Sequence, residues 1–428
     1  MIRKERSANA GPIMGRGLGQ GPRRRLGRAI LAATTLAGSV MLAAGSGVAH
    51  AQQSIVTEQG QDFGTVAGSQ PRPGTSTVPT WRDTFTDPTD GRQYSVTMVG
   101  GGDPRTPGAG TTTIPADIVP LDFAFTGPTN QAFNGSEDVP AVVGSPMFQD
   151  NDYSSFSDNP HEQYLDAIER SEFDQVGPSP FHLKLAPQVM PTLSLTVNAA
   201  HGQVLTYPSG LHYGCVDAYW LFDRIWEYIH VHQISPQSVP IFVMEYTRGG
   251  IMSKGACIPA YSGLHGAGNP GRGQGAYGAE VEGQTWMIST YEPAPIRPIT
   301  PDHPYTYSNI DTLGHEIAEW AHDPYGLNTV QPYQFPNVVA GPTFCASIFE
   351  TGDPVNQIEI RLPGNTYFQD RPGNDGTWWL QDEVLLPWFA RQSPNVTSEP
   401  EASSGAGRYT FFGDRNDDPR FHAPAKSC

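Results

Sequence analysis

Residues 310–323 place five ionisable side chains on one side of a single predicted helix. Ser308 or Asn309 can cap its first turn, and Pro324 ends it. An apolar face should pack on the rest of the protein; it comprises Leu313, Ile317 and Trp320. The ionisable side chains share a separate arc; they are His315, Glu316, Glu319, His322 and Asp323. Buried carboxylates without partners are costly, so this arc either faces water or is organised by a cation.

The spacing within this arc suits a metal ion. His315 and Glu319 are one turn apart, about 6 Å along the helix axis, so an imidazole and a carboxylate can converge on one ion. Glu316 lies beside them, where the glutamate of a His-Glu-x-x-His zinc hydrolase acts as general base. The match is partial, because Glu319 replaces the second histidine. A solvated helix face, on which Glu, His and Asp are ordinary, is the alternative interpretation.

The first 51 residues have the pattern of an export signal. A basic head is followed by an apolar run of small residues over 29–48, and Ala49-His50-Ala51 matches a small-x-small cleavage site. A retained membrane anchor is the alternative, because the run is about long enough to span a bilayer. The expected result is a signal peptide over 1–51 and a mature protein secreted to the extracellular space.

The charge of the mature chain limits its partners. Residues 1–51 carry eight Arg or Lys and one Glu, so the rest of the chain has a formal charge of −24, compared with −17 for the whole. A surface this acidic repels phosphate backbones, which excludes nucleic acid as an expected partner. No later segment approaches the length of a membrane span, so no membrane partner is expected once the signal is removed.

Four cysteines follow the signal: Cys215, Cys257, Cys345 and Cys428. An exported protein with an even number of cysteines favours two disulfides, and none of the spacings is that of a structural zinc site. Pairing of sequence neighbours favours Cys215–Cys257 and Cys345–Cys428, although four cysteines allow three connectivities.

The composition along the chain predicts one main domain between two less regular segments. Residues 52–112 are a Gly- and Pro-rich lead-in, expected to be partly disordered, and residues 393–428 form a polar tail. Within 113–392, strands are predicted over 118–125, 239–246, 257–261, 285–291 and 358–362, and helices over 161–170, 215–232, 310–323 and from 384. A strand is also expected over 94–99, inside the lead-in. The Gly-rich stretch 263–283, which carries His265, is interpreted as a mobile surface loop.

The order of these elements gives the fold class. A long buried helix, several strands and then a helix with a metal-ligand pattern is the order found in zincin-type metallopeptidases. The prediction is therefore an α+β fold of zincin-like metallopeptidase architecture, in which a mixed sheet packs on a long helix and on a metal-site helix.

The motif and a downstream segment together resemble a known group of proteins. The His315-to-Pro324 stretch is followed by Cys345 and by Phe349-Glu350-Thr351-Gly352-Asp353-Pro354. This pattern is similar to that of secreted, largely uncharacterised zincin-like proteins, with a His-Glu-x-x-Glu helix ending in Asp-Pro and a downstream Glu-x-Gly-Asp segment. The resemblance covers roughly residues 113–389.

The resemblance implies a site. His315, Glu319 and Glu350 would be metal ligands, with zinc as the cofactor, and Glu316 the general base. Two anionic ligands reduce the Lewis acidity of the ion relative to a site with two neutral imidazoles. Weaker candidates for a ligand, or for a partner that orients one, are Asp353, His322 and Asp323.

Three functions are compatible with these features. The first is a secreted zinc-dependent hydrolase, a peptidase acting on peptide or protein through metal-activated water. The second is a non-catalytic secreted binding or surface protein that keeps a structural metal on the same fold. The third is a metal-free carbohydrate-binding domain with three exposed tryptophans, namely Trp378, Trp379 and Trp388.

Overall fold

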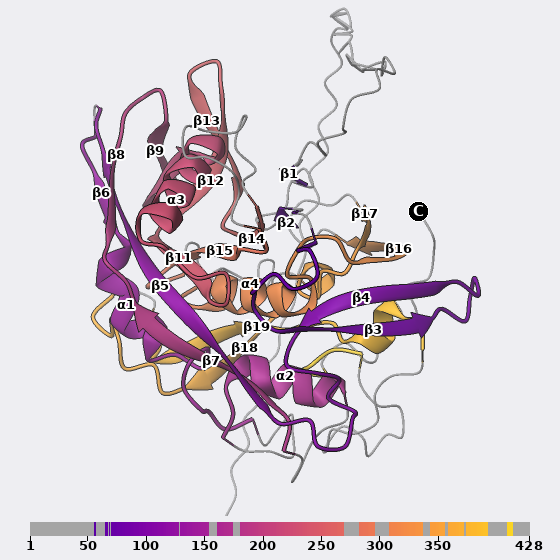
Figure 1. Ribbon diagram of the computed structural model, residues 1–428. Helices are drawn as coiled ribbons and strands as arrows, with labels where there is room; N and C mark the ends of the chain where they lie inside the picture. The colour runs from indigo at the N-terminus through magenta and orange to yellow at the C-terminus, as the bar shows by residue number, and fades with distance from the viewer. Residues whose placement is uncertain are drawn as a thin grey trace, which may run out of the picture. The chain divides into compact units, whose positions relative to one another are not determined.

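A computed structural model of the 428-residue chain gives the fold (Figure 1). It describes residues 55–56, 65–66, 68, 70–127, 129–153, 161–173, 180–268, 282–295, 308–336, 343–355, 358–371, 374–392 and 409–413. The chain divides into two units, Met1–Ala51 and Gln52–Cys428. The predicted export signal lies outside the described residues, as do Cys428 and nearly all of the predicted tail. Among the described residues no helix combines the length and apolarity that a bilayer crossing requires.

The second unit is built on a mixed nine-stranded sheet in the order β1-β2-β14-β15-β11-β5-β6, with β7 and β8 also paired to β5. Its strands are β1 (Ile55–Val56), β2 (Thr65–Val66), β5 (Thr111–Phe125), β6 (Ala132–Asn134), β7 (His182–Val189), β8 (Leu193–Val197), β11 (Val239–Glu245), β14 (Gly263–Ala267) and β15 (Thr285–Tyr291). β11 is parallel to both β5 and β15, whereas β14 is antiparallel to β15. The predicted α+β class with a mixed sheet is confirmed at this level.

Alternation along β5 sends its side chains into two hydrophobic cores, one on each face of the sheet. Ile114 and Ile118 enter the first core and Leu121 and Phe123 enter the second. The first core contains apolar residues of α1 (Gly135–Val143), α2 (Tyr164–Glu172) and α4 (Asp311–His322), and the second contains those of α3 (Ala218–Val231). Figure 1 accordingly shows α3 and α4 on opposite sides of β11 and β15.

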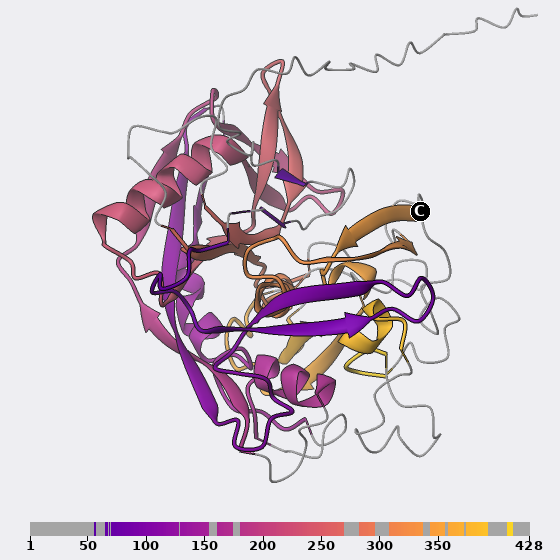
Figure 2. The same ribbon diagram turned by 45° about the vertical axis from the view of Figure 1, so that its right-hand side comes forward.

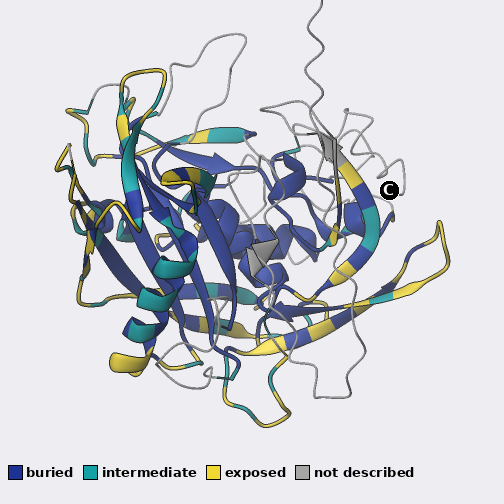
Figure 3. Cartoon of the chain, turned by 90° about the horizontal axis from the view of Figure 1, so that it is seen from above, coloured by how far each residue is buried: buried dark blue, intermediate teal, exposed yellow. Residues whose placement is uncertain are grey.

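The helix α4 is enclosed on all sides. It contacts β14, β15, β4 (Gln93–Val99), β19 (Thr377–Gln381) and α2, and every one of its residues is buried (Figure 3). The predicted apolar face lies in the first core, with Leu313, Ile317 and Trp320 at most 2% exposed. The predicted side-chain cap is wrong: Oδ1 of Asn309 accepts hydrogen bonds from the backbone N–H of Ile310 and of Trp379 instead.

A second sheet carries a disulfide. It has the order β13-β12-β10-β9, formed by β9 (Gly202–Thr206), β10 (His212–Asp217), β12 (Thr247–Ser253) and β13 (Ala256–Tyr261). The predicted Cys215–Cys257 disulfide joins β10 and β13 across β12. Gly250 of β12 lies beneath it, where a Cβ would approach Sγ of Cys215 to 2.8 Å. Cys345 is also disulfide-bonded, but its predicted partner Cys428 lies outside the described residues.

Three two-stranded sheets complete the described fold: β3 (Thr80–Thr86) with β4, β16 (Thr329–Pro336) with β17 (Thr343–Ile348), and β18 (Glu359–Pro363) with β19. The short 3₁₀ turn η1 (Asp353–Val355) lies between β17 and β18 in the chain, and the helix α5 (Leu386–Phe389) follows β19. The β3–β4 hairpin shows that part of the predicted lead-in is ordered, since Val96 and Met98 are fully buried in a third core. Figure 2 shows this hairpin passing alongside α4.

Candidate metal centre

The predicted pair on α4 comes together in the structure. Nε2 of His315 lies 2.9 Å from Oε2 of Glu319, one turn further along the helix. Asp353, at the start of η1, joins them, and the donor atoms of all three residues lie within 4.8 Å of one another. His315 is fully buried and Glu319 is 1% exposed. Asp353, which was only a weaker candidate from the sequence, therefore lies beside His315 and Glu319.

Backbone contacts fix the Asp353 segment on α4. Oε1 of Glu319 accepts hydrogen bonds from the N–H groups of Gly352 and Asp353, each at 3.1 Å. Gly352 passes so close to the His315 ring that a Cβ at this position would overlap Nδ1. A side chain other than hydrogen at residue 352 would therefore push the segment away from the helix.

The plane of the His315 ring is set by β19. Nε2 of Gln381 lies 2.8 Å from Nδ1 of His315 and also donates to the carbonyl oxygen of Gly352 at 3.0 Å. A ligating histidine is commonly held in this way through the ring nitrogen that does not face the metal. Gln381 thus directs Nε2 of His315 toward Glu319.

A second histidine, His265, belongs to the same centre, although sequence reasoning missed it. It lies on β14, is fully buried, and its Nδ1 is 3.2 Å from Oε2 of Glu316 and 3.7 Å from Oε2 of Glu319. The interpretation of residues 263–283 as a surface loop is wrong over Gly263–Ala267, which forms this buried strand; residues 269–281 lie outside the described part. Because Leu264 enters the second core, strand alternation turns His265 toward α4.

Glu350, the predicted third ligand, lies next to this histidine. Its Oε2 is 3.7 Å from Nε2 of His265, and its carboxyl group also interacts with that of Glu319. It lies two residues after the end of β17 and is 1% exposed. The structure thus brings Glu350 to the centre, but Asp353 rather than Glu350 completes the group around His315.

Burial dominates the electrostatics of the centre. It raises the pKa of Glu316 well above its ordinary value, and repulsion from Glu319 and Asp353 adds to this. Burial also opposes ionisation of Glu319, but the attraction of His315 and His265 outweighs it and lowers the pKa of Glu319. The pKa of His265 falls to about 4 because burial disfavours the imidazolium, although Glu319 resists the change.

The donors present fit a divalent metal ion. Oε1 of Glu316 and Nε2 of His265 are buried and have no hydrogen-bond partner among the described residues. Within the described chain, Glu316 and Glu319 lie within ion-pair distance of histidines and of no lysine or arginine. Imidazole nitrogen with carboxylate oxygen is a ligand set that zinc accepts. A bound cation would offset the charge of these buried carboxylates.

Two of the predicted candidates lie elsewhere. His322 faces α2, where its Nε2 is 2.7 Å from Oε2 of Glu172 and 3.6 Å from Oε1 of Glu169. Asp323 accepts hydrogen bonds from the N–H groups of Leu327 and Asn328, and so closes the turn after α4. Neither belongs to a group of donors around His315. The 100° spacing of a helix predicted both side chains on the same polar arc as His315. In the structure His322 contacts α2 instead, and Asp323 contacts the turn that follows α4.

A separate group of Glu162, Asp166 and His182 also has converging donors. Here, however, the charges are paired within the protein. Glu162 forms a buried ion pair of 2.6 Å with Arg170, and Asp166 contacts Nδ1 of His182 at 2.7 Å. We interpret this group as structural, because its carboxylates already have partners.

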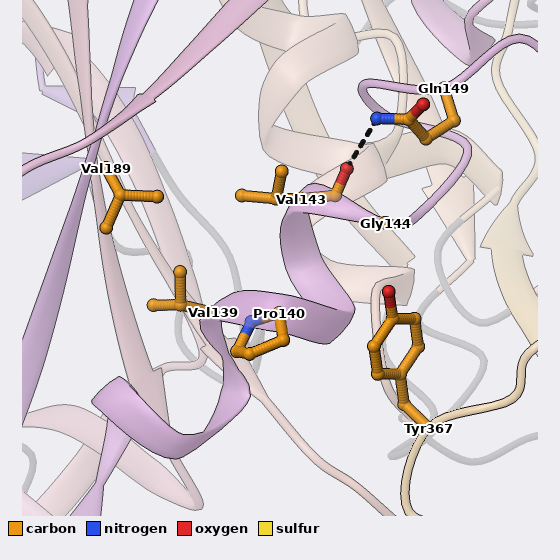
Figure 4. Close-up of a pocket in the computed structure, with 7 residues that line it drawn as sticks. All are labelled: Val139, Pro140, Val143, Gly144, Gln149, Val189 and Tyr367. Atoms are coloured by element: carbon orange, nitrogen blue, oxygen red, sulfur yellow. Dashed lines mark hydrogen bonds between the residues drawn. The ribbon is translucent and has the colours of Figure 1, made fainter.

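The hollow in Figure 4 shares no lining residue with the metal centre. It has a volume of about 650 Å³ and is lined by apolar residues of α1 together with Gln149, Val189 and Tyr367. Nε2 of Gln149 donates to the carbonyl oxygen of Val143 at 2.9 Å. Its lining contains no histidine, cysteine or carboxylate, so this hollow offers no set of metal ligands, and Tyr367 is the one titratable side chain among its lining residues.

Comparison with known proteins adds no family. No protein-family model matches the chain, and no curated protein and no solved structure matches it significantly. Of the predicted resemblance, the part supported here is the buried group of His265, Glu316 and Glu319, which could hold a metal.

Proposed function

We propose that this protein is a secreted zinc-dependent hydrolase that cleaves peptide bonds. The observation that carries the proposal is the buried convergence of His315, Glu319 and Asp353, with Glu316 directly beside them on α4. The disulfide Cys215–Cys257 supports the secreted location, because disulfides persist in oxidising compartments. The zincin-like character is also part of the proposal: α4 lies against β14 and β15, with the long helix α3 on the opposite face of the sheet.

The residues of the chain would divide the work as follows. A zinc ion, when bound, supplies Lewis acidity and lowers the pKa of water in its vicinity. Glu316 accepts the proton of the attacking water, since its Oε1 has no hydrogen-bond partner in the described structure. Gln381 and the backbone of Gly352 hold His315 and Glu319 in place. The excess of carboxylates around the centre predicts a slower hydrolase than one with two neutral imidazole ligands.

The test combines zinc content with hydrolysis of a peptide library. Replacing Glu316 by Gln should leave zinc bound at His315, Glu319 and Asp353 and reduce peptide hydrolysis by on the order of 10² to 10⁴-fold, the range of general-base catalysis. The matched control is Glu137→Gln, at an exposed glutamate on α1. Unchanged turnover in Glu316→Gln removes Glu316 as the base, and a protein without zinc removes the hydrolase proposal.

Complete burial of the centre favours one alternative, a secreted protein with a structural metal. His265, His315 and Glu316 are fully buried, whereas a catalytic zinc site keeps a position open to substrate. In that case a chelator lowers the melting temperature while no peptide is hydrolysed. The carbohydrate-binding alternative is contradicted, because Trp378, Trp379 and Trp388 are only 1–2% exposed and present no stacking face.

A further inference from the structure

The donors around α4 form two groups that share one carboxylate. The first is His315, Glu319 and Asp353, and the second is His265, Glu316 and Glu319. Oε2 of Glu319 lies between them, 2.9 Å from Nε2 of His315 and 3.7 Å from Nδ1 of His265. Donors bound to one tetrahedral zinc are separated by about 3.3 Å, given metal–ligand distances near 2.0–2.1 Å. Each group suits one ion, and neither group contains both histidines.

Each histidine is also oriented as a ligand would be. Nδ1 of His315 is held by Gln381, which leaves Nε2 for a metal. His265 is turned the other way: its Nδ1 faces Glu316 and Glu319, and its Nε2 lies 3.7 Å from the carboxylate of Glu350. A carboxylate beside the second ring nitrogen is the usual support for a metal-bound imidazole. At 3.7 Å Glu350 is within ion-pair distance of His265 but beyond hydrogen-bond distance, so it fits the role of a charge partner of His265 better than that of ligand to the His315 ion.

The buried carboxylates at the centre favour two divalent ions over one. Glu319, Glu350 and Asp353 contribute up to three negative charges, Glu316 adds a fourth when it is ionised as a ligand, and all four residues are at most 5% exposed. One divalent ion would leave two negative charges in a site removed from water, which is unfavourable. A second ion removes that excess.

Two glycines allow the main chain to approach the donor side chains on either side of Glu319. A Cβ at Gly263 would overlap Oε1 of Glu316, and a Cβ at Gly352 would overlap Nδ1 of His315. One glycine thus borders each donor group, on β14 and on the segment before η1 respectively. Both donor groups are therefore closely packed against the main chain, as expected for two preformed metal sites.

We propose that this centre binds two divalent cations bridged by the carboxylate of Glu319, one held by His315 and Asp353 and the other by His265 and Glu316. The inference rests on the proposed function only in using the same cluster of donors. Glu316 would bind through Oε2, the oxygen that faces His265, and its Oε1 would remain available as a base. In two-metal hydrolases a pair of ions stabilises both the attacking and the leaving groups, which would compensate for the low Lewis acidity of either ion alone.

Metal stoichiometry tests this proposal without reference to turnover. The purified protein is stripped by dialysis against a chelator and titrated with zinc, followed by calorimetry and by elemental analysis after gel filtration. Two ions per chain support the proposal. One ion per chain overturns it while leaving the proposed function in place, and no bound ion overturns both.

Two variants assign the ions. His265→Ala and His315→Ala should each bind one ion, whereas His212→Ala, at an exposed histidine on β10, should bind two. Loss of no ion in either variant overturns the assignment. If a variant fails to fold, manganese loading of the unaltered protein decides the question: an exchange-coupled electron paramagnetic resonance spectrum supports two neighbouring ions, and an isolated-ion spectrum at saturation overturns the proposal.

Discussion

The buried contact between His322 and α2 should make stability fall as the pH rises from 6 to 9.5. Glu172 and Glu169 face His322. Burial disfavours the imidazolium, but these carboxylates outweigh it and raise the pKa of His322 from 6.5 to about 9. A pKa raised in the folded state gives stability that is fully present below pH 6.5 and lost as the pH passes about 9. At 1.36 kcal/mol per unit, the change is about 3 kcal/mol.

The informative variant replaces both partners, as His322→Gln/Glu172→Gln. Replacing His322 alone would leave the Glu172 carboxylate buried without its cation. The resulting loss of stability would come from an unpaired buried charge and not from the titration of His322. Burial raises the pKa of Glu169 to about 8, which adds pH dependence of the same sign in both proteins. His322 lowers and Glu172 raises the pKa of Glu169, so the double variant removes two opposing effects on Glu169 together, and the difference between the proteins mainly reports the pair.

The assay is urea unfolding at pH 6.0 and 9.5, with a chelator present throughout. The free energy of unfolding should fall by about 3 kcal/mol more in the unaltered protein than in the double variant. Parallel pH profiles for the two proteins would refute the reasoning, because they would show that His322 is not a cation held by α2.

Three further predictions concern the disulfide and the metal centre. Replacing Cys215 and Cys257 together by Ser should lower the free energy of unfolding by about 4 kcal/mol, from their sequence separation of 42, as measured by urea unfolding; an unchanged midpoint would contradict this. Gln381→Leu should weaken zinc binding by about 10- to 100-fold in competition with a chromophoric chelator, because the His315 ring loses its support. Gly263→Ala should displace Glu316 and abolish peptide hydrolysis while the circular dichroism spectrum is retained, and full activity would exclude the close packing described.

The sequence was sufficient to predict two of the regular elements. The strand over 285–291 and the apolar face of the helix at 310–323 match the structure closely, because the first is a short run rich in apolar and aromatic residues and the second has Leu313, Ile317 and Trp320 at helical spacing. Glycine-containing strands such as β14 and β12 were missed, since Gly263, Gly249 and Gly250 lower strand propensity and resemble a loop. The predicted helix from 215 begins at Ala218, because Asp217 caps it by accepting from the N–H of Trp220.

Residue spacing alone could predict the candidate site only where its residues are neighbours in sequence, whereas Glu350 and Asp353 were predicted from the resemblance. His315, Glu316 and Glu319 share one helix, so their spacing fixes their proximity. His265 and Asp353 reach the same place through β14 and η1, and no local pattern states that contact. One signal in the sequence could have identified His265. Leu264 is apolar and lies in the second core, so in a strand its neighbour His265 must point to the opposite face of the sheet.

The length of β5 has a consequence for how the molecule unfolds. This single 15-residue strand contributes side chains to both sheet-facing cores and pairs with β6, β7, β8 and β11. Neither core can melt while the other keeps β5 in place, so the two should lose amide protection together in native-state hydrogen exchange. Global unfolding, rather than local opening, would then determine how often the donors around α4 are exposed to solvent.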